Sequence, residues 1–250
     1  MVLCNGNGTR LLAQPHNSVT RENIFAFSAA AAALAGAAYF SPVLWRRQRM
    51  ARLRAEYRKN RILALTYDDG PSDVVTPELL DLLGRYSARG TFFMLGRQAQ
   101  RHPAIADRIL HEGHTVGCHS ARHLNAWKTL PSAAVADIRD GYELLARWVS
   151  PDGMYRPPYG KMTLPTYAEI QRRDASVWWW TIDSGDTFDK LPRIGDIADH
   201  VRKESGGIVL MHDLDRGQQR NQYVLEVTEA LLQVSAQSSL RIQPLLPESK

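Results

Sequence analysis

The residues of this chain that could do chemistry stand where short apolar runs of sequence end. Asp68 and Asp69 close the first run, His119 follows a later one, and His212 closes another. Three more polar residues follow the remaining runs in the same way: Arg156, Asp183 and Asp186. If the runs are parallel strands of an α/β barrel, their carboxyl ends share one face, and that face carries the active site. The pattern therefore predicts that several distant segments converge on one site.

The types of these residues favour metal-assisted hydrolysis. His119 and His123 have a spacing that would place two imidazoles on one face of a helical turn, as a ligand pair for a transition metal. Two histidines and a carboxylate make a three-ligand site with room for water, which is the composition of a catalytic zinc-type centre. An iron oxygenase has the same ligand set. The further carboxylate, arginine and histidine have no evident role in oxygen chemistry, so hydrolysis is favoured.

The elements that must position these residues alternate between short apolar runs and segments of helical period. The expected strands cover 62–67, 91–95, 114–118, 153–156, 176–182, 207–212 and 240–243. The expected helices include one capped by Thr76, one over 102–112 and one over 132–149. This alternation predicts a parallel sheet covered by helices, as a closed barrel or an open doubly wound sheet. No glycine-rich phosphate loop follows a strand, so no nucleotide cofactor is expected.

Several of these segments resemble, in sequence and in order, the motifs of polysaccharide deacetylases, the NodB-homology group known as carbohydrate esterase family four. They are Thr66–Pro71, Gly90–Phe93, Glu112–His114, His119–His123, Arg156–Gly160 and Leu210–Asp213. The resemblance covers about 61–244, and it implies a deacetylase domain over 61–250 with the fold of a distorted (β/α) barrel. It also implies removal of N-acetyl groups from amino sugars with one divalent metal ion, Zn or else Co or Ni.

The resemblance also implies roles for single residues. Asp69, His119 and His123 would bind the metal, Asp68 would be the general base, and Arg156 would keep Asp68 ionised. The Tyr159 backbone N–H would stabilise the oxyanion, and His212 would be the general acid, kept cationic by Asp186. Leu210 and Trp180 would form the wall against the acetyl methyl.

The sequence departs from the family pattern at two places. Tyr67 stands where the family usually has Phe, which is a small change in a buried ring. Thr187 follows Asp186 where the family usually has Trp. This second departure implies a reshaped acetyl pocket, and it leaves both Asp183 and Asp186 as candidates for the partner of His212.

Charge and composition narrow the class of protein. The 250 residues are 44% hydrophobic and 23% charged, which is typical of a globular protein. The net charge of +5 is unevenly divided, because residues 1–60 carry nine Lys and Arg against two Glu, and residues 61–250 carry 22 basic against 24 acidic groups. A nucleic-acid-binding domain would have a basic face, so nucleic acid is not an expected partner. The two cysteines, Cys4 and Cys118, make no disulfide framework.

The uncharged stretch 24–45 predicts a transmembrane helix between an N-terminal tail, 1–23, and a basic juxtamembrane linker, 46–60. As a helix its 22 residues are ~33 Å long, enough to cross a ~30 Å hydrocarbon core. A buried Ala-rich helix and a cleaved signal peptide are the alternatives. Six arginines and Lys59 follow the stretch, whereas Arg10 and Arg21 precede it. Lys and Arg accumulate on the cytoplasmic side, so we expect the domain there, at the inner membrane.

The sequence therefore predicts a membrane-attached, metal-dependent hydrolase that deacetylates N-acetylglucosamine-type units. Its glycan could be a chitin-like oligomer, peptidoglycan or a lipid-linked precursor, because all three present this unit. The alternative is a catalytically silent, membrane-tethered domain that binds a glycan.

Overall fold

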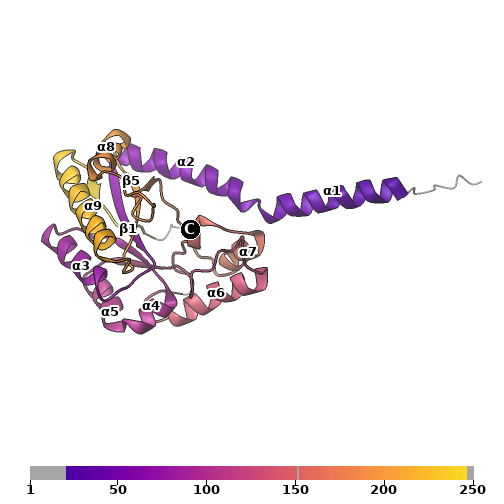
Figure 1. The fold of residues 1–250 in the computed structure, drawn as a ribbon, viewed down its shortest axis with the longest axis horizontal. Helices are drawn as coiled ribbons and strands as arrows, with labels where there is room; N and C mark the ends of the chain where they lie inside the picture. The colour runs from indigo at the N-terminus through magenta and orange to yellow at the C-terminus, as the bar shows by residue number, and fades with distance from the viewer. Residues whose placement is uncertain (1–20, 151, 247–250) are drawn as a thin grey trace, which may run out of the picture. The chain divides into compact units, whose positions relative to one another are not determined.

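The computed structural model describes residues 21–150 and 152–246 (Figure 1). The chain divides into two compact units, Met1–Ala38 and Tyr39–Lys250. The expected tail falls mostly on residues 1–20, outside the described residues. The second unit holds all the strands and all the candidate site residues.

The second unit is built on a parallel sheet, as expected. Its strands are β1 (Ile62–Asp68), β2 (Thr91–Met94), β3 (Thr115–Cys118), β4 (Ile182–Asp183), β5 (Gly207–His212) and β6 (Arg241–Ile242). The order is β3-β2-β1-β5-β4, and β6 pairs with the first residues of β1. β1 lies in the middle of this order and is almost entirely buried, which explains its continuous apolar sequence.

Two irregular segments, one at Tyr155 and one at Val177, continue the sheet from its β3 edge towards β4 at its other edge. Cys118 at the end of β3 bridges to Tyr155, and Tyr155 bridges to Val177. The chain then runs on from Val177 into β4, which pairs with β5. The expected strands 153–156 and 176–182 are therefore reduced to single bridges and to β4. The reason is a change of partner, because Trp178 N–H donates to Tyr155 and Thr181 N–H donates to Ile208.

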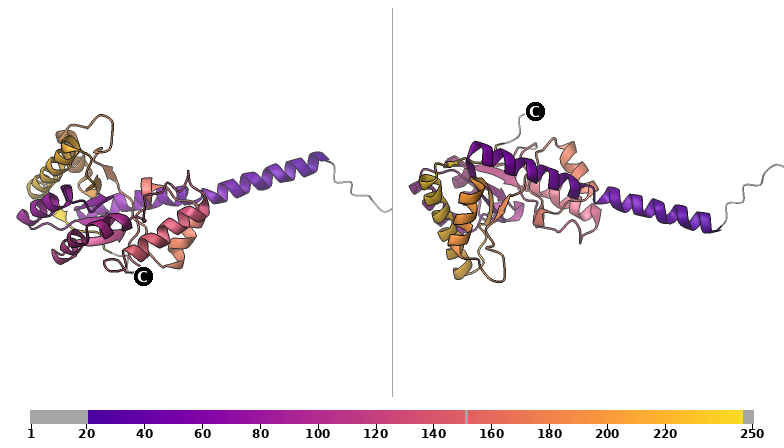
Figure 2. Two further views of the ribbon diagram at one scale, coloured as in Figure 1. Left: turned by 60° about the horizontal axis from the view of Figure 1, so that its bottom comes forward. Right: turned by 90° about the horizontal axis from the view of Figure 1, so that it is seen from above.

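Helices surround the strands (Figures 1 and 2). They are α3 (Val75–Arg85), α4 (Gly96–Arg101), α5 (Pro103–His111), α6 (Pro131–Leu144), α7 (Leu164–Arg172), α8 (Ile194–Glu204) and α9 (Gln218–Gln237). A short 3-10 helix spans Pro158–Gly160. Thr76 does not cap α3, contrary to expectation. It lies inside the first turn, where its hydroxyl accepts the Ser72 N–H and donates to Asp213.

The first unit contains most of helix α1 (Arg21–Tyr39). Of the described residues, one helical stretch, Ser28–Asn60, which runs from α1 into α2, contains a segment long and apolar enough to cross a membrane. A signal sequence near an N-terminus has the same character. The side chains from Ser28 to Ala38 are exposed, whereas a buried Ala-rich core helix would cover them.

Residues 46–60, expected as a linker, belong to a helix of the folded domain. Helix α2 (Pro42–Asn60) begins at a proline, which suits the first helical position, and it packs against β1 and β5. Leu53 and Tyr57 are buried in a core cluster with Trp178 and Ile208. The expected helix over 24–45 is likewise interrupted, because α1 ends at Tyr39 and α2 begins at Pro42.

We predict that Leu53→Ala destabilises the folded domain, because it leaves a cavity between α2 and the sheet. The free energy of unfolding should fall by ~2–5 kcal/mol, the usual range for a buried leucine. Urea unfolding followed by tryptophan fluorescence would measure it, with exposed Arg52→Ala as the control on the same helix. Equal stability of the two variants would mean that α2 is a dispensable linker.

Candidate active site and metal centre

The polar residues singled out from the sequence gather around one cavity at the carboxyl ends of the strands. Its volume is about 370 Å³. The lining residues are Asp68, Asp69, His119, His123, Tyr159, Lys161, Trp180, Asp183, Thr187, Leu210, His212 and Arg216. Arg156 and Asp186 lie behind this lining, each bonded to one of its members.

Asp69, His119 and His123 form a cluster suited to a metal ion. One ligand atom from each lies within 4.8 Å of the others. Asp69 Oδ1 is 3.4 Å from His119 Nε2 and 3.2 Å from His123 Nε2. Their spacing predicted that the two histidines share a helical turn, and this prediction is wrong. They stand on a loop in which Ser120 and His123 have left-handed φ values of 70° and 64°, and the Ser120 hydroxyl accepts the His123 N–H.

The surroundings of this cluster fit a bound cation. Asp69 Oδ1 is buried and has no hydrogen-bond partner, which a buried carboxylate oxygen rarely tolerates. His119 Nδ1 lies 2.7 Å from the carbonyl oxygen of Arg156. A carbonyl only accepts, so Nδ1 carries the proton and the Nε2 lone pair is free for a metal. The three donor atoms are two imidazole nitrogens and one carboxylate oxygen. Zn²⁺ and the other divalent transition metals of its row bind such donors.

The pKa values in the cluster also suit ligation. Burial, followed by the nearby charge of His119, lowers the pKa of His123 to about 4, so this imidazole is neutral near pH 7. Burial alone would raise the pKa of Asp69. The close approach of the His119 imidazole, followed by the other nearby histidines, more than offsets burial and holds the pKa of this carboxyl well below its ordinary value.

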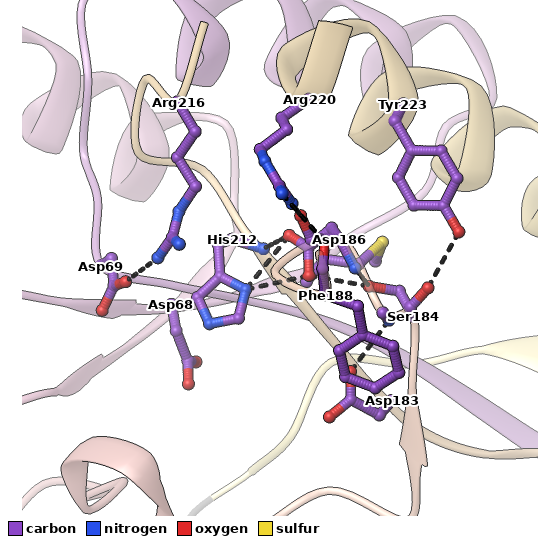
Figure 3. Close-up of polar contacts among 12 residues, drawn as sticks. Asp68, Asp69, Asp183, Ser184, Asp186, Phe188, His212, Arg216, Arg220 and Tyr223 are labelled. Carbon is purple, nitrogen blue, oxygen red and sulfur yellow. Dashed lines mark hydrogen bonds and ion pairs between the residues drawn. The ribbon is translucent and has the colours of Figure 1, made fainter. Parts of the chain in front are cut away.

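Arg216 is a site residue that the sequence reasoning missed. It lies in the loop after β5, and its Nη2 donates to Asp69 Oδ2 over 2.7 Å (Figure 3). Asp69 therefore uses one oxygen for Arg216 and turns the other towards the histidines. Asp69 also has a left-handed φ of 75°, so the chain turns sharply as it leaves β1. Together the turn and Arg216 fix the direction of the candidate ligand oxygen.

Asp68 is held by a buried arginine. Arg156 Nη1 donates to Asp68 Oδ1 over 2.8 Å and to the Thr66 hydroxyl over 2.7 Å. Arg156 is fully buried, and its guanidinium lies 4.1 Å from the centre of the Phe93 ring. Burial lowers the pKa of Arg156 and the charge of Asp68 opposes that change. Because the arginine holds one oxygen of Asp68, the carboxylate is fixed in direction at the cavity wall.

His212 is paired with Asp186, not with Asp183 (Figure 3). Its Nδ1 is 3.1 Å from both carboxylate oxygens of Asp186, and its backbone N–H donates to the same group. Burial alone would lower the pKa of His212, but the hydrogen bond and charge of Asp186 outweigh it and raise the pKa to about 9. Asp183 instead accepts the Gly185 N–H and faces the cavity. Of the two candidate carboxylates, the structure therefore pairs Asp186 with His212 and leaves Asp183 at the cavity.

Apolar side chains complete the cavity. Trp180 and Leu210 lie in its wall, as expected, and Thr187 lies there too. Tyr159 has a left-handed φ of 55°, which is costly for a residue with a side chain and is typical of functional positions. Gly160 must be glycine, because an added Cβ would lie 2.9 Å from Trp180. Lys161 and Arg216 are the lining residues to which the sequence reasoning had given no role.

Comparisons with known proteins point to one family. The sequence profile described as "Polysaccharide deacetylase" matches residues 55–178. A peptidoglycan-N-acetylglucosamine deacetylase of Bacillus cereus is 35% identical over 181 residues, which cover 71% of this chain and 83% of that protein. A chitooligosaccharide deacetylase of Azorhizobium caulinodans is 28% identical over 153 residues, 60% of this chain and 72% of that one. The structure of the peptidoglycan deacetylase PdaC from Bacillus subtilis superposes with a TM-score of 0.63 at 26% identity, covering 75% of this chain and 89% of PdaC.

We predict that Arg216→Gln weakens metal binding by ~10–100-fold, the usual effect of losing a residue that orients a ligand. The neutral amide cannot hold Asp69 Oδ2 as the guanidinium does, so Oδ1 loses its fixed direction. Competition with a chelating dye for Zn²⁺ would measure the affinity.

Arg220→Gln is the matched control for this prediction. Arg220 lies in the same region, but it donates only to the backbone carbonyls of Asp186 and Phe188. An affinity for Zn²⁺ that is equal in the two variants would show that Arg216 does not orient Asp69.

Proposed function

The chain belongs to the polysaccharide deacetylase family, and we propose that it hydrolyses the N-acetyl amide of N-acetylglucosamine-type units in a glycan with one divalent metal ion. The observation that carries the proposal is the meeting of three kinds of group at one cavity. These are the Asp69, His119 and His123 cluster, the Asp68 carboxylate held by Arg156, and the His212 imidazole held by Asp186.

The metal site would be built from Asp69, His119 and His123. When bound there, a divalent ion supplies a Lewis acid for the amide carbonyl and lowers the pKa of water from ~15.7 towards about 7. Zn, Co and Ni all suit two imidazoles and a carboxylate, and availability decides among them. Arg216 and the carbonyl of Arg156 orient the ligands.

The protein groups then divide the proton transfers. Asp68 takes a proton from the attacking water as the new C–O bond forms, and Arg156 keeps its carboxylate in place. The Tyr159 N–H would stabilise the negative charge that develops on the carbonyl oxygen. His212, with Nδ1 bound to Asp186, gives the proton on its other nitrogen to the leaving amine as the C–N bond breaks. The products are acetate and a free amino sugar.

The substrate would be an N-acetylated glycan, as the names of the relatives from Bacillus cereus and Azorhizobium caulinodans suggest. Leu210 and Trp180 provide an apolar wall for the acetyl methyl. Thr187, in place of the family's usual tryptophan, makes that wall smaller and more polar. A silent glycan-binding domain would have no use for a carboxylate and an imidazole that are each held in position by a buried partner.

We predict that Asp68→Asn keeps the metal but lowers the turnover rate by ~10²–10⁴-fold, the usual range for a lost general base. The amide has nearly the same shape as the carboxylate, yet it cannot accept the proton. Acetate release and metal content would be measured on the same samples. His119→Ala is the comparison variant and should lose both. An active Asp68→Asn protein would exclude Asp68 as the base.

We predict that Asp186→Asn moves the alkaline limit of activity to lower pH. Protonated His212 is the acid, so activity in the native protein should persist until the pH passes the His212 pKa of about 9. Without the carboxylate that pKa falls towards its ordinary value of ~6.5, and activity is lost at correspondingly lower pH. The pH profile of kcat tests this. Asp183→Asn is the matched control and should leave the limit in place.

We also propose that the helix beginning in α1 attaches the domain to the inner membrane, on the cytoplasmic side. Its support is the excess of Lys and Arg over 46–60 compared with 1–23. C-terminal fusions would measure the side, because alkaline phosphatase is active only outside the cell and green fluorescent protein exported by the general secretory route fluoresces only inside. Fluorescence without phosphatase activity is expected. The reverse result would place the domain outside and leave the deacetylase proposal intact.

A further inference from the structure

We infer that the face of the domain that carries the active site rests on the bilayer. Four exposed apolar side chains, called here the rim patch, would enter the boundary between headgroups and acyl chains; two of them are in contact, and each of the other two stands three or four residues further along the chain. They are Phe40, Leu44, Trp127 and Leu130. The inference rests on the proposed membrane attachment and adds the surface that meets the lipid. It holds for either side of the membrane.

The direction of α2 places the active site near the membrane. Its C-terminal residue, Asn60, is joined to the start of β1 by Arg61 alone, and the helix packs along β1 and β5. Its 19 residues are ~28 Å long, so the helix leads back along the barrel from the amino ends of the strands to their carboxyl ends. A chain that entered β1 directly from a membrane span would instead hold the cavity far from the bilayer.

Contacts at the first turn of α2 confirm this direction. Trp45 packs on Trp179, with ring centres 5.0 Å apart. The Arg46 guanidinium lies 5.4 Å from the centre of the Trp180 ring, which lines the cavity. The amino end of α2 therefore stands at the mouth of the active site. Because α1 ends at Tyr39, the domain begins beside its own active site.

Two side-chain contacts connect the rim patch from this point to the cavity. The Phe40 ring lies 5.6 Å from the Trp127 ring. Lys161 Nζ lies 4.0 Å from the centre of the Trp127 ring, and Lys161 itself lines the cavity. The Trp127 indole N–H donates to the Met162 carbonyl, which fixes the ring in place. One aromatic contact and one cation–π contact thus join the start of the domain to the cavity.

The exposure and charge of the rim patch fit a lipid surface. Phe40 is 44% exposed, Leu44 65%, Trp127 41% and Leu130 74%. Arg47 and Lys128 stand among them in the sequence and are exposed, and Lys161 is half-buried beside Trp127. Aromatic and leucine side chains flanked by Lys and Arg are the composition of a surface that enters the interface and holds anionic headgroups.

The bilayer is the occupant that the chain itself brings to this patch. The uncharged residues of α1 lie immediately before Phe40 in the sequence, so a chain inserted in the membrane there brings the rim patch to the membrane surface. The consequence for function is a restriction on substrate. The reacting amide must lie close to the membrane surface, so the preferred substrate is an amino sugar carried on a lipid, near its point of attachment.

Fluorescence quenching in vesicles tests the placement with the full chain. Cys4 is changed to Ser, Cys118 is buried and stays, and a single cysteine carrying an environment-sensitive dye is placed by Leu130→Cys. The matched control is Leu110→Cys, an exposed leucine of α5, a helix that lies away from the amino end of α2 (Figure 1). The vesicles contain phosphatidylcholine, phosphatidylglycerol and a lipid with a nitroxide high on its acyl chain.

We expect about a twofold or greater loss of fluorescence at position 130 and almost none at position 110, because an inserted surface reaches ~5–10 Å into the interface. Protein that stays on carbonate-washed vesicles with equal quenching at the two positions would overturn the inference. Protein washed off the vesicles would overturn it together with the membrane attachment. Quenching at position 130 in a protein that releases no acetate from any N-acetylated glycan would support the inference and contradict the deacetylase proposal.

Leu130→Glu provides a second measurement that does not depend on a dye. Acetate release from a lipid-linked N-acetylated oligosaccharide in vesicles should fall several-fold, whereas release from the same oligosaccharide in free form should not change. An equal effect on both substrates would contradict the inference. Leu110→Glu is the control and should affect neither.

Discussion

One buried arginine connects most of the parts of this site. The Arg156 guanidinium holds Asp68 and Thr66 on β1, its carbonyl accepts from His119, and its N–H donates to Cys118 at the end of β3. Burying such a charge costs several kcal/mol unless it is paired, and the Asp68 carboxylate and the face of the Phe93 ring provide that compensation. The candidate base and a candidate metal ligand are therefore fixed by the same residue, and neither can shift without disturbing the other.

The surroundings of His123 and His212 shift the pKa values of these two histidines in opposite directions. His123 has its pKa lowered by burial and by its neighbour His119, so it is neutral and suited to a metal. His212 is also buried, yet Asp186 raises its pKa and keeps it cationic near pH 7. One residue type is thus suited to the proposed ligand role at one position and to the proposed acid role at another, because the neighbouring groups differ.

Much of the site was predictable from the sequence, because strand ends are local features and parallel strands bring their carboxyl ends together. Asp68, Asp69, His119 and His212 were placed correctly on that ground. The loop geometry of His119 and His123 was not, since a spacing of four residues fits both a helix and a turn with left-handed residues. Arg216 was missed because its bond to Asp69 joins residues 147 positions apart. Helix α2 was missed because its many arginines obscured the regular spacing of Trp45, Leu53 and Tyr57.

The central claim is that this geometry removes acetyl groups with the help of a metal ion. The most direct measurement is acetate release from N-acetylglucosamine oligomers and from a lipid-linked N-acetylated glycan by the purified full chain. It would be made before and after treatment with a chelator, and again after addition of Zn²⁺, Co²⁺ or Ni²⁺. Release that chelation abolishes and a divalent ion restores is the predicted result. A folded protein that binds metal but releases no acetate from any of these glycans would contradict the account.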